Sequence, residues 1–454
     1  MFIAKIYTSK GKTTQNGGEK DMKKRFLALS LAAAIAAGTL AGCGSSGGSS
    51  ASGGDDDTLV VWTLAADLED FAKHYEEETG TKVDVTVIAP ADYPTKINTT
   101  LGSRNKDVDI IVGEPQMLMD FYDADFFADL SEFDSAASEK LVDYVYEAGK
   151  DEDGVLRALS YQVTPGSVIY RRDLAKEVFG TDDPAVIGEK FSSYDAIVET
   201  AKQLDAAGYS IFGDTGAMRW FANADEAWVK DGKLQMTDSR LDYMDAAVEL
   251  YKNKYVAFAT EWSAAWYASM AGELPKNDTS GEATSETTQV FSYVMPSWGA
   301  LVIRDNAKDN KGKFGVAKGI CSFFGGGTFI GVNEFSDNQE EAKKFVEFCT
   351  LNEDVAQWWL EESDGDNVAI KSVLEANKDY ENPSFGNQKT YAFFAEEASA
   401  VDYSLITRYD TAIGDAFGQA IEAIQKGEKD KETALKDFYL EVQSVYPEIE
   451  VPTV

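Results

Sequence analysis

The segment from residue 58 to residue 113 alternates strand-like and helix-like patterns, and this alternation constrains the fold more than any other feature. The stretches TLVVWTL (58–64) and DVDIIVG (107–113) are apolar runs typical of strands, and KVDVTVI (82–88) alternates apolar and polar residues. Between them, DLEDFAKHYEEETG and YPTKINTTLGSR have helical spacing, and the first ends in a glycine. Strands that alternate with helices predict an α/β fold in which helices cover a parallel sheet.

The N-terminal region has the composition of a secretory signal followed by a tether. The basic MKKR (22–25) precedes the apolar FLALSLAAAIAAGTLAG, which is too short and too rich in alanine for a membrane span. The sequence LAGC (40–43) resembles the bacterial lipobox, which implies cleavage before Cys43 and lipidation of its thiol. An ordinary signal peptide with an incidental cysteine is the alternative. We expect residues 1–42 to be upstream residues plus signal peptide, with Met22 as the natural start, and residues 43–57 to be the lipidated cysteine and a flexible tether.

The charge balance narrows the classes of partner. The chain has 78 acidic and 42 basic side chains, for a net charge of −36. Such a chain repels nucleic acid and anionic lipid surfaces, so we expect no nucleic-acid partner and a neutral or cationic ligand. An apolar content of 44% indicates a globular protein, and the length is sufficient for two domains with cores of their own.

Cysteine and histidine are scarce, which argues against several kinds of catalysis. After Cys43 only Cys321 and Cys349 remain, in the apolar segments KGICSFF and KFVEFCTLN, and buried free thiols are favoured over a disulfide. The only histidine is His74, on a predicted solvated helix face. The stretch ESDGDN (362–367) lacks the calcium-loop pattern and reads as a turn. We therefore expect no cofactor, no metal and no enzymatic activity.

Several stretches, in order along the chain, resemble the extracellular solute-binding proteins of the maltose-binding type. They begin with the strand–helix segments above and continue with YQVTPGSVIYRRDLAKEVFG, TTQVFSYVMPSWGALVI and KFGVAKGICSFFGGGTFIGVNEFSDNQEEAKKFVEFC. The resemblance covers nearly the whole chain after residue 58. The loop after DVDII departs from the best-known maltose binder, because it offers Glu114 and Gln116 where that protein has a tryptophan and acidic residues, and this departure puts maltose specificity in doubt.

The resemblance implies an α/β, two-lobe periplasmic-binding-protein type II fold, the Venus flytrap, with hinge strands and the ligand between the lobes. We expect residues 58–160 and 325–375 to form the N-terminal lobe, and residues 161–324 and 376–454 the C-terminal lobe. In open parallel sheets, ligands bind beyond the carboxyl ends of the strands. The loops that follow VVWTL, DIIVG and VMPSW are therefore candidate walls of the cleft.

Aromatic side chains are the strongest candidates for ligand contact. A tryptophan or tyrosine ring covers the flat apolar face of a pyranose, while carboxylates, amides and arginine bind its hydroxyl edge. Trp298 follows an apolar strand, and Trp262 and Trp266 are four residues apart, which predicts one helix face for both. Core packing is the alternative for each tryptophan. The predicted ligand-binding residues are Trp298, Trp262, Trp266, Trp220, Glu114, Gln116, Tyr161, Gln162, Phe324, Gly325, Gly326, Arg408, Tyr409 and Asp67.

The leading functional hypothesis is a substrate-binding lipoprotein of an ABC transporter. It captures a carbohydrate, an oligosaccharide, by closing two lobes around it and delivers it to a permease. We expect a monomer on the extracellular face of the cytoplasmic membrane, attached through the lipid on Cys43 alone. A binding protein for a peptide, polyamine or other small solute, a surface carbohydrate-active enzyme, and a sensor or adhesin without a transport role remain alternatives.

Overall fold

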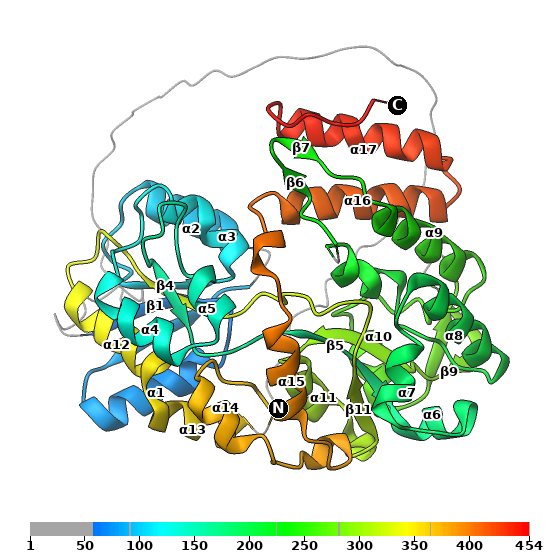
Figure 1. The fold of residues 1–454 in the computed structure, drawn as a ribbon, viewed down its shortest axis with the longest axis horizontal. Helices are drawn as coiled ribbons and strands as arrows, with labels where there is room; N and C mark the ends of the chain where they lie inside the picture. The colour runs from blue at the N-terminus through cyan, green and yellow to red at the C-terminus, as the bar shows by residue number, and fades with distance from the viewer. Residues whose placement is uncertain (1–57, 90–91, 224, 280–281, 364, 454) are drawn as a thin grey trace, which may run out of the picture. The chain divides into compact units, whose positions relative to one another are not determined.

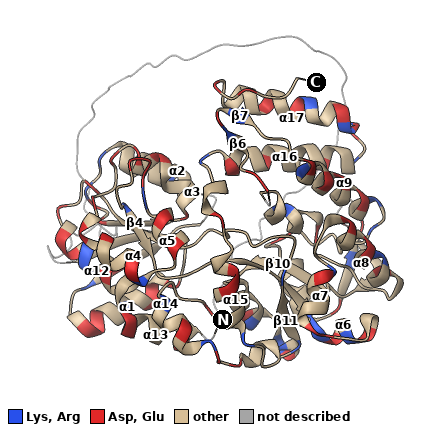
Figure 2. Cartoon of the chain, viewed as in Figure 1, with Lys and Arg blue, Asp and Glu red and all other residues tan. Residues whose placement is uncertain are grey.

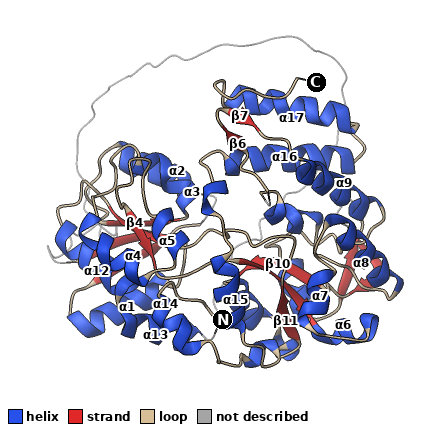
Figure 3. Ribbon diagram, in the orientation of Figure 1, coloured by secondary structure: helices blue, strands red, loops and turns tan. Residues whose placement is uncertain are grey.

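A computed structural model describes residues 58–89, 92–223, 225–279, 282–363 and 365–453, and Figure 1 shows their arrangement. The predictions of a signal peptide, a lipidated Cys43 and a tether lie outside these residues. The described chain builds two α/β groups of elements, each with its own sheet and its own buried side chains. Figure 3 shows the two groups of strands apart from each other, with helices around each.

The first group is built on a five-stranded sheet. The strand order is β2-β1-β3-β12-β4, in which β1, β2 and β3 are parallel and β12 is antiparallel to both β3 and β4. The three strands expected before residue 113 are present, which confirms the predicted parallel pairing. The strands are β1 (Leu59–Thr63), β2 (Val83–Val87), β3 (Ile110–Gly113), β4 (Ala158–Ser160) and β12 (Phe329–Val332).

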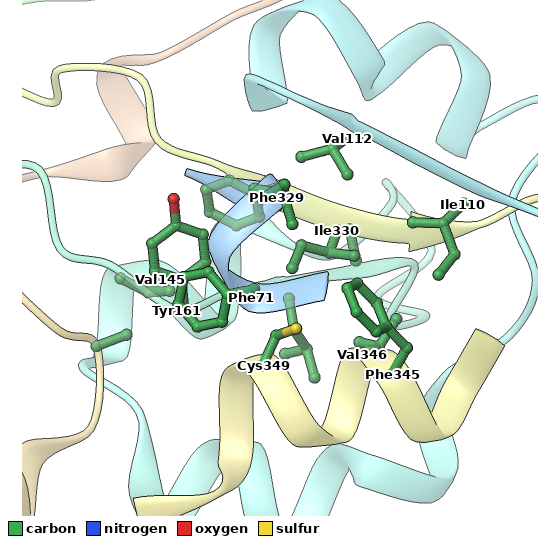
Figure 4. Close-up of a cluster of buried hydrophobic side chains, with 14 of the residues drawn as sticks. Phe71, Ile110, Val112, Val145, Tyr161, Phe329, Ile330, Phe345, Val346 and Cys349 are labelled. Atoms are coloured by element: carbon green, nitrogen blue, oxygen red, sulfur yellow. The ribbon is translucent and has the colours of Figure 1, made fainter. Parts of the chain in front are cut away.

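Helices cover this sheet and close the first core. Cys349 on α12, Phe71 on α1 and Ile330 on β12 belong to one buried cluster, part of which Figure 4 shows. The helices of this group are α1 (Leu68–Thr79), α2 (Tyr93–Gly102), α3 (Pro115–Tyr122), η1 (Ser131–Phe133), α4 (Asp134–Lys140), α5 (Asp143–Ala148), α12 (Gln339–Leu351), α13 (Glu353–Ser363) and α14 (Lys371–Asn377).

The second group is built on a three-stranded antiparallel sheet of order β10-β5-β11. Its larger core lies among α8, α9, α16 and α17, and a smaller one lies between α10, α11 and the sheet. Its elements are β5 (Gly166–Arg171), α6 (Arg172–Phe179), α7 (Pro184–Glu189), α8 (Tyr194–Ala206), η2 (Thr215–Phe221), β6 (Val229–Lys230), β7 (Lys233–Leu234), α9 (Asp238–Lys252), α10 (Ala264–Ala271), β8 (Leu274–Asn277), β9 (Ala283–Thr288), β10 (Ser292–Pro296), α11 (Gly299–Asn306), η3 (Lys308–Asn310), β11 (Phe314–Ala317), α16 (Asp410–Gln425) and α17 (Lys431–Val445).

Two expectations from the sequence are corrected here. The polar composition of residues 275–288 predicts a surface loop, but the antiparallel strands β8 and β9 occupy most of this stretch. Most of β9 is exposed, so its threonines favour a strand without adding to a core. Trp262 and Trp266 do not share a helix face, because α10 begins at Ala264 after an N-cap at Ser263, and Trp262 has a positive φ of 67°.

Three stretches of chain connect the two groups. The first joins β4 to β5, and the second joins β11 to β12. The third contains η4 (Pro383–Phe385), α15 (Thr390–Ser399) and η5 (Tyr403–Leu405). Along this third stretch Ile406 packs against the first core and Tyr409 against the second. Figure 1 shows α15 between the two groups. The domain boundaries given above remain a prediction.

Two further expectations concern chemistry and membranes. Cys321 and Cys349 are both free thiols, as predicted, and they pack in different cores. Within the described ranges no helix has both the length and the apolar character that crossing a membrane requires. Acidic side chains are spread over both groups of elements in Figure 2, in keeping with the net charge of −36.

Candidate functional site

A cavity of about 680 Å³ lies between α3 of the first group and η2 and α16 of the second. This volume is within the range of small-molecule sites. Both groups of elements contribute side chains to its wall, as does the connecting segment before α16. The lining includes Gln116, Arg219, Trp220, Asn223, Trp228, Tyr243, Phe323, Phe324, Asp402, Asp410, Thr411, Gly414, Asp415, Gly418, Gln419 and Glu422.

An aromatic wall on one side of this cavity is built around Trp220. The ring of Trp220 stacks on that of Phe323, with centroids 5.1 Å apart and planes 17° from parallel. The Arg219 guanidinium lies 4.7 Å from the centroid of the Trp220 ring. The indole Nε1 of Trp220 is buried and has no hydrogen-bond partner among the described residues. The wall therefore presents aromatic surface to the cavity.

Arg219 is held by carboxylates of the second group. It forms an ion pair with Glu261, and the Asp214 carboxylate accepts hydrogen bonds from the backbone N–H groups of Gly216 (2.7 Å) and Glu261 (2.8 Å). Burial raises the pKa of Asp214 and of Glu261, while the guanidinium of Arg219 opposes that shift in both. The positive charge of Arg219 is thus balanced within the protein, and the described residues that line the cavity include no other lysine or arginine to attract an anionic solute.

Glu114 lies at the end of β3, where it precedes α3. Its Oε2 atom accepts a hydrogen bond of 2.7 Å from Nε2 of Gln116. The carboxyl also lies against Gly326, where an added Cβ would come within 2.8 Å of the carboxyl carbon. Burial raises the pKa of Glu114 to about 7, and Arg219 partly opposes this shift. The structure therefore places Glu114, Gln116 and Gly326 together, and the carbonyl oxygen Oε1 of Gln116 is buried without a partner among the described residues.

The glycines of the connecting segment 323–328 permit a close approach of chains. The N–H of Gly325 donates to the Thr164 carbonyl oxygen at 3.0 Å, and a Cβ at Gly325 would lie 2.0 Å from Cγ of Pro296. Trp298, the N-cap residue of α11, donates from Nε1 to the Gly325 carbonyl oxygen at 3.0 Å. Phe324 lines the cavity and packs on Tyr403 at 5.2 Å.

Trp262 and Trp298 form a second aromatic surface that is not part of the cavity lining. Their ring centroids lie 5.7 Å apart, and Trp262 also lies 5.0 Å from Trp266. Trp262 is 46% exposed, whereas Trp266 is 4% exposed and packs in the smaller core of the second group. Of this pair, only Trp262 therefore presents its ring to solvent.

Asp67, Tyr161 and Gln162 lie in a buried polar network where the connecting segments meet. Tyr161 donates its hydroxyl hydrogen to Asp67. Gln162 donates from Nε2 to Asp366 at 2.9 Å and accepts from Thr328 at 3.1 Å. Burial raises the pKa of Asp67, and it raises the pKa of Asp366 to about 6. These side chains join three segments far apart in sequence, and none of them lines the cavity.

Arg408 and Tyr409 precede α16 and also lie outside the cavity lining. The guanidinium of Arg408 pairs with Asp120 on α3, at 2.7 Å, and with Asp123 at the end of that helix. The ring of Tyr409 packs on Tyr446 at 5.0 Å. Both side chains therefore hold the third connection in place in this conformation.

Several lining residues were not among the predicted contacts. Phe323, Asn223 and the polar side chains of α16 belong to this group, including Asp410, whose pKa is raised by burial to about 6. Asp410 accepts hydrogen bonds from Thr407 (2.5 Å) and from Asn223 (3.0 Å). The sequence carried one signal for the face of α16 that lines the cavity. This signal is the pair of glycines four residues apart in the interior of the helix.

The site contains hydrogen-bonding groups, carboxyls and aromatic rings. In the described part of the chain, no group of three histidine, cysteine, aspartate or glutamate side chains is arranged to hold a metal ion. Cys321 lines the cavity, and burial raises the pKa of its thiol to about 12. A thiol with so high a pKa is a poor nucleophile. The arrangement is suited to holding a polar solute against a flat ring.

Comparisons with known proteins agree with this geometry. A protein-family model described as bacterial extracellular solute-binding protein matches residues 70–385. Among proteins with curated functions, no sequence matches this chain. A solved structure described as an extracellular solute-binding protein of family 1 superposes with a TM-score of 0.69 at 19% identity, covering 85% of this chain and 99% of that one.

Two further solved structures have the same fold. The ABC-transporter-associated binding protein of B. animalis subsp. lactis Bl-04, in complex with β-1,6-galactobiose, has a TM-score of 0.69 at 19% identity and covers 88% of this chain and 100% of its own. The GacH receptor of Streptomyces glaucescens GLA.O has a TM-score of 0.67 at 16% identity and covers 87% of this chain and 99% of its own. At these identities the likeness establishes the two-lobe α/β fold that the sequence predicted.

Proposed function

The chain belongs to the bacterial extracellular solute-binding proteins, and from that premise we propose that it captures an oligosaccharide between its lobes and delivers it to the permease of an ABC importer. The observation that carries this proposal is the cavity of about 680 Å³, whose lining combines the stacked rings of Trp220 and Phe323 with carboxyl and amide groups. Similar folds are described in complex with β-1,6-galactobiose, with maltose and with lacto-N-biose, which supports a sugar as the solute.

The chemistry of the lining suits a sugar better than an anion. A pyranose places its C–H face on a ring such as Trp220, and its hydroxyl groups both donate and accept hydrogen bonds. The lining residues Asn223, Thr411 and Gln419 carry amide and hydroxyl groups that can donate to and accept from such hydroxyl groups.

A second candidate is a cationic small solute such as a polyamine. The cavity wall includes the acidic residues Asp402, Asp410, Asp415 and Glu422, against the single cation of Arg219, which is already paired. An excess of carboxylates attracts a positively charged solute. The aromatic wall suits either solute, since an ammonium group also binds over a tryptophan ring. The sugar is favoured because similar folds are described in complex with sugars.

We also propose a location and a mode of action. Cys43 carries a lipid that attaches the protein to the outer face of the cytoplasmic membrane, and the protein acts there as a monomer without turning its ligand over. The residue division given above, 58–160 with 325–375 and 161–324 with 376–454, forms the two lobes. Binding favours the closed arrangement over the open one, because the solute contacts both lobes only when they are closed.

Calorimetry tests this function directly. The mature protein is titrated with a panel of neutral oligosaccharides, uronic-acid oligomers, polyamines and short peptides, and we expect saturable binding to neutral oligosaccharides alone. Small-angle scattering then should show a smaller radius of gyration with the best ligand. Saturable binding of a polyamine but of no sugar would establish the second candidate instead, and slow release of shorter sugars in proportion to protein concentration would indicate an enzyme.

A further inference from the structure

The cavity wall has one feature that the function above does not explain. Along α16 the lining residues recur on one face, from Asp410 through Gly414 and Gly418 to Glu422. Residues four apart lie one above another on a helix, so these form a single stripe. At 1.5 Å per residue the stripe is about 18 Å long, and the wall therefore extends well beyond the region around Trp220.

The two glycines in the middle of this stripe leave it open. A Cβ built at Gly414 or at Gly418 would meet no heavy atom within 4 Å. Both have ordinary helical backbones, because neither has a positive φ. Glycine in a helix interior is less favourable than alanine, so two of them weaken α16. Packing does not require glycine at either position, because a Cβ there would meet no heavy atom within 4 Å.

The composition of the stripe indicates what can lie on it. Thr411, Asp415, Gln419 and Glu422 flank the glycines and offer hydroxyl, amide and carboxylate groups. No lysine or arginine of α16 lines the cavity. Such a surface binds hydroxyl groups through hydrogen bonds and repels carboxylates and phosphates. It suits a hydroxylated, uncharged chain better than an anion.

We propose that Gly414 and Gly418 keep an open groove along α16 that accepts the distal units of an uncharged oligosaccharide longer than a disaccharide. The inference rests on the proposed function and deepens it, because it names the length and charge of the solute. One end of the solute lies on the Trp220–Phe323 wall, and the remaining units follow α16 toward Glu422.

Side chains added at the two glycines test the groove. In the variants Gly414→Ala/Gly418→Ala and Gly418→Leu, a methyl or isobutyl group occupies the space of the distal units, and both residues favour helix over glycine. We expect each variant to melt at a temperature equal to or above that of the wild type. Gly102→Ala is the matched control, because a Cβ at this glycine at the end of α2 also meets nothing within 4 Å and the residue lies outside the cavity lining.

The readout is affinity against chain length. Calorimetry is run with malto-oligosaccharides and β-galacto-oligosaccharides of two to five units. For Gly418→Leu we expect tenfold or greater weakening for the longest bound glycans and less than twofold for the disaccharide, with the control unchanged throughout. The proposed function fails, and this inference with it, if wild-type protein binds no glycan of either series. The inference alone is overturned if wild-type protein binds them and the variants weaken no length, or weaken all lengths equally.

Discussion

Replacing Glu114 with glutamine should remove a pH dependence of stability that the structure assigns to one carboxyl. Glu114 is largely buried between Gln116 and Gly326, and its pKa is raised from 4.5 to about 7 chiefly by burial. Glutamine has the same shape and cannot ionise. Its side-chain oxygen can still accept the hydrogen bond from Nε2 of Gln116, so the substitution removes the titration and keeps the local contacts.

The sign and size of the effect follow from linkage. Below about pH 4.5 the carboxyl is protonated in both the folded and the unfolded chain, and its burial carries no ionic penalty. As the pH rises toward 7 the unfolded chain loses this proton first, so the free energy of unfolding falls. Above about pH 7 both states are ionised and the loss is complete. A shift of about 2.5 pKa units corresponds to about 3 kcal/mol at 1.36 kcal/mol per unit.

Urea unfolding at half-unit steps from pH 4 to pH 8 measures this quantity. The free energy of unfolding of the wild type minus that of Glu114→Gln should fall by about 3 kcal/mol across the range, and the subtraction cancels titrations common to both proteins. Glu78→Gln, at an exposed position near the end of α1, is the matched control for exchanging glutamate for glutamine outside a buried site. Parallel pH profiles for the wild type and Glu114→Gln would refute the burial argument.

Three further outcomes are expected. Trp262→Ala should leave the melting temperature of the free protein nearly unchanged, whereas Trp266→Ala should lower stability by about 3–5 kcal/mol, because the first ring is 46% exposed and the second is 4% exposed. Equal melting temperatures for both variants would contradict the assignment. Gly325→Ala should destabilise the protein by about 3 kcal/mol or more in denaturant unfolding, because its Cβ would lie 2.0 Å from Cγ of Pro296. An unchanged unfolding midpoint would show that the segment around Gly325 moves aside easily. Cys43→Ala should release the protein from membranes or leave an unprocessed precursor, and an unmodified Cys43 in the native protein, detected by mass spectrometry, would exclude the anchor.

The strands of the first lobe could be predicted from sequence because their patterns are local. β3 is a run of apolar residues buried on both faces, β1 alternates buried and partly buried residues, and each lies within the segment that its pattern indicated. The pairing of β12 between β3 and β4 has no such local signal, because more than 150 residues separate this strand from its neighbours. Only the resemblance to a known family pointed to a return strand at that place.

The candidate site was partly predictable, because residue type is also a local signal. Aromatic residues and the loop after β3 attract notice by residue type, and Trp220, Gln116 and Phe324 do line the cavity. Spacing alone misled for Trp262, because four residues between two tryptophans do not reveal that the helix starts after the first of them. Arg408 has the chemistry of a ligand contact, but its charge is used by Asp120 and Asp123, which are almost 300 residues away in the chain.

The acidic composition of the chain and the carboxylates of the cavity wall both disfavour an anionic solute. The first acts at long range and the second acts at contact. A net charge of −36 slows the approach of anions, an effect that salt screens beyond about 8–10 Å. Within the cavity, Arg219 is paired with Glu261, and the carboxylates of α16 face the solute. There the repulsion of an anion is short-ranged and largely unscreened, so added salt should restore the association rate of an anionic sugar far more than its affinity. A neutral oligosaccharide loses nothing at either stage, because its hydroxyl groups hydrogen-bond to the same carboxylates that exclude the anion.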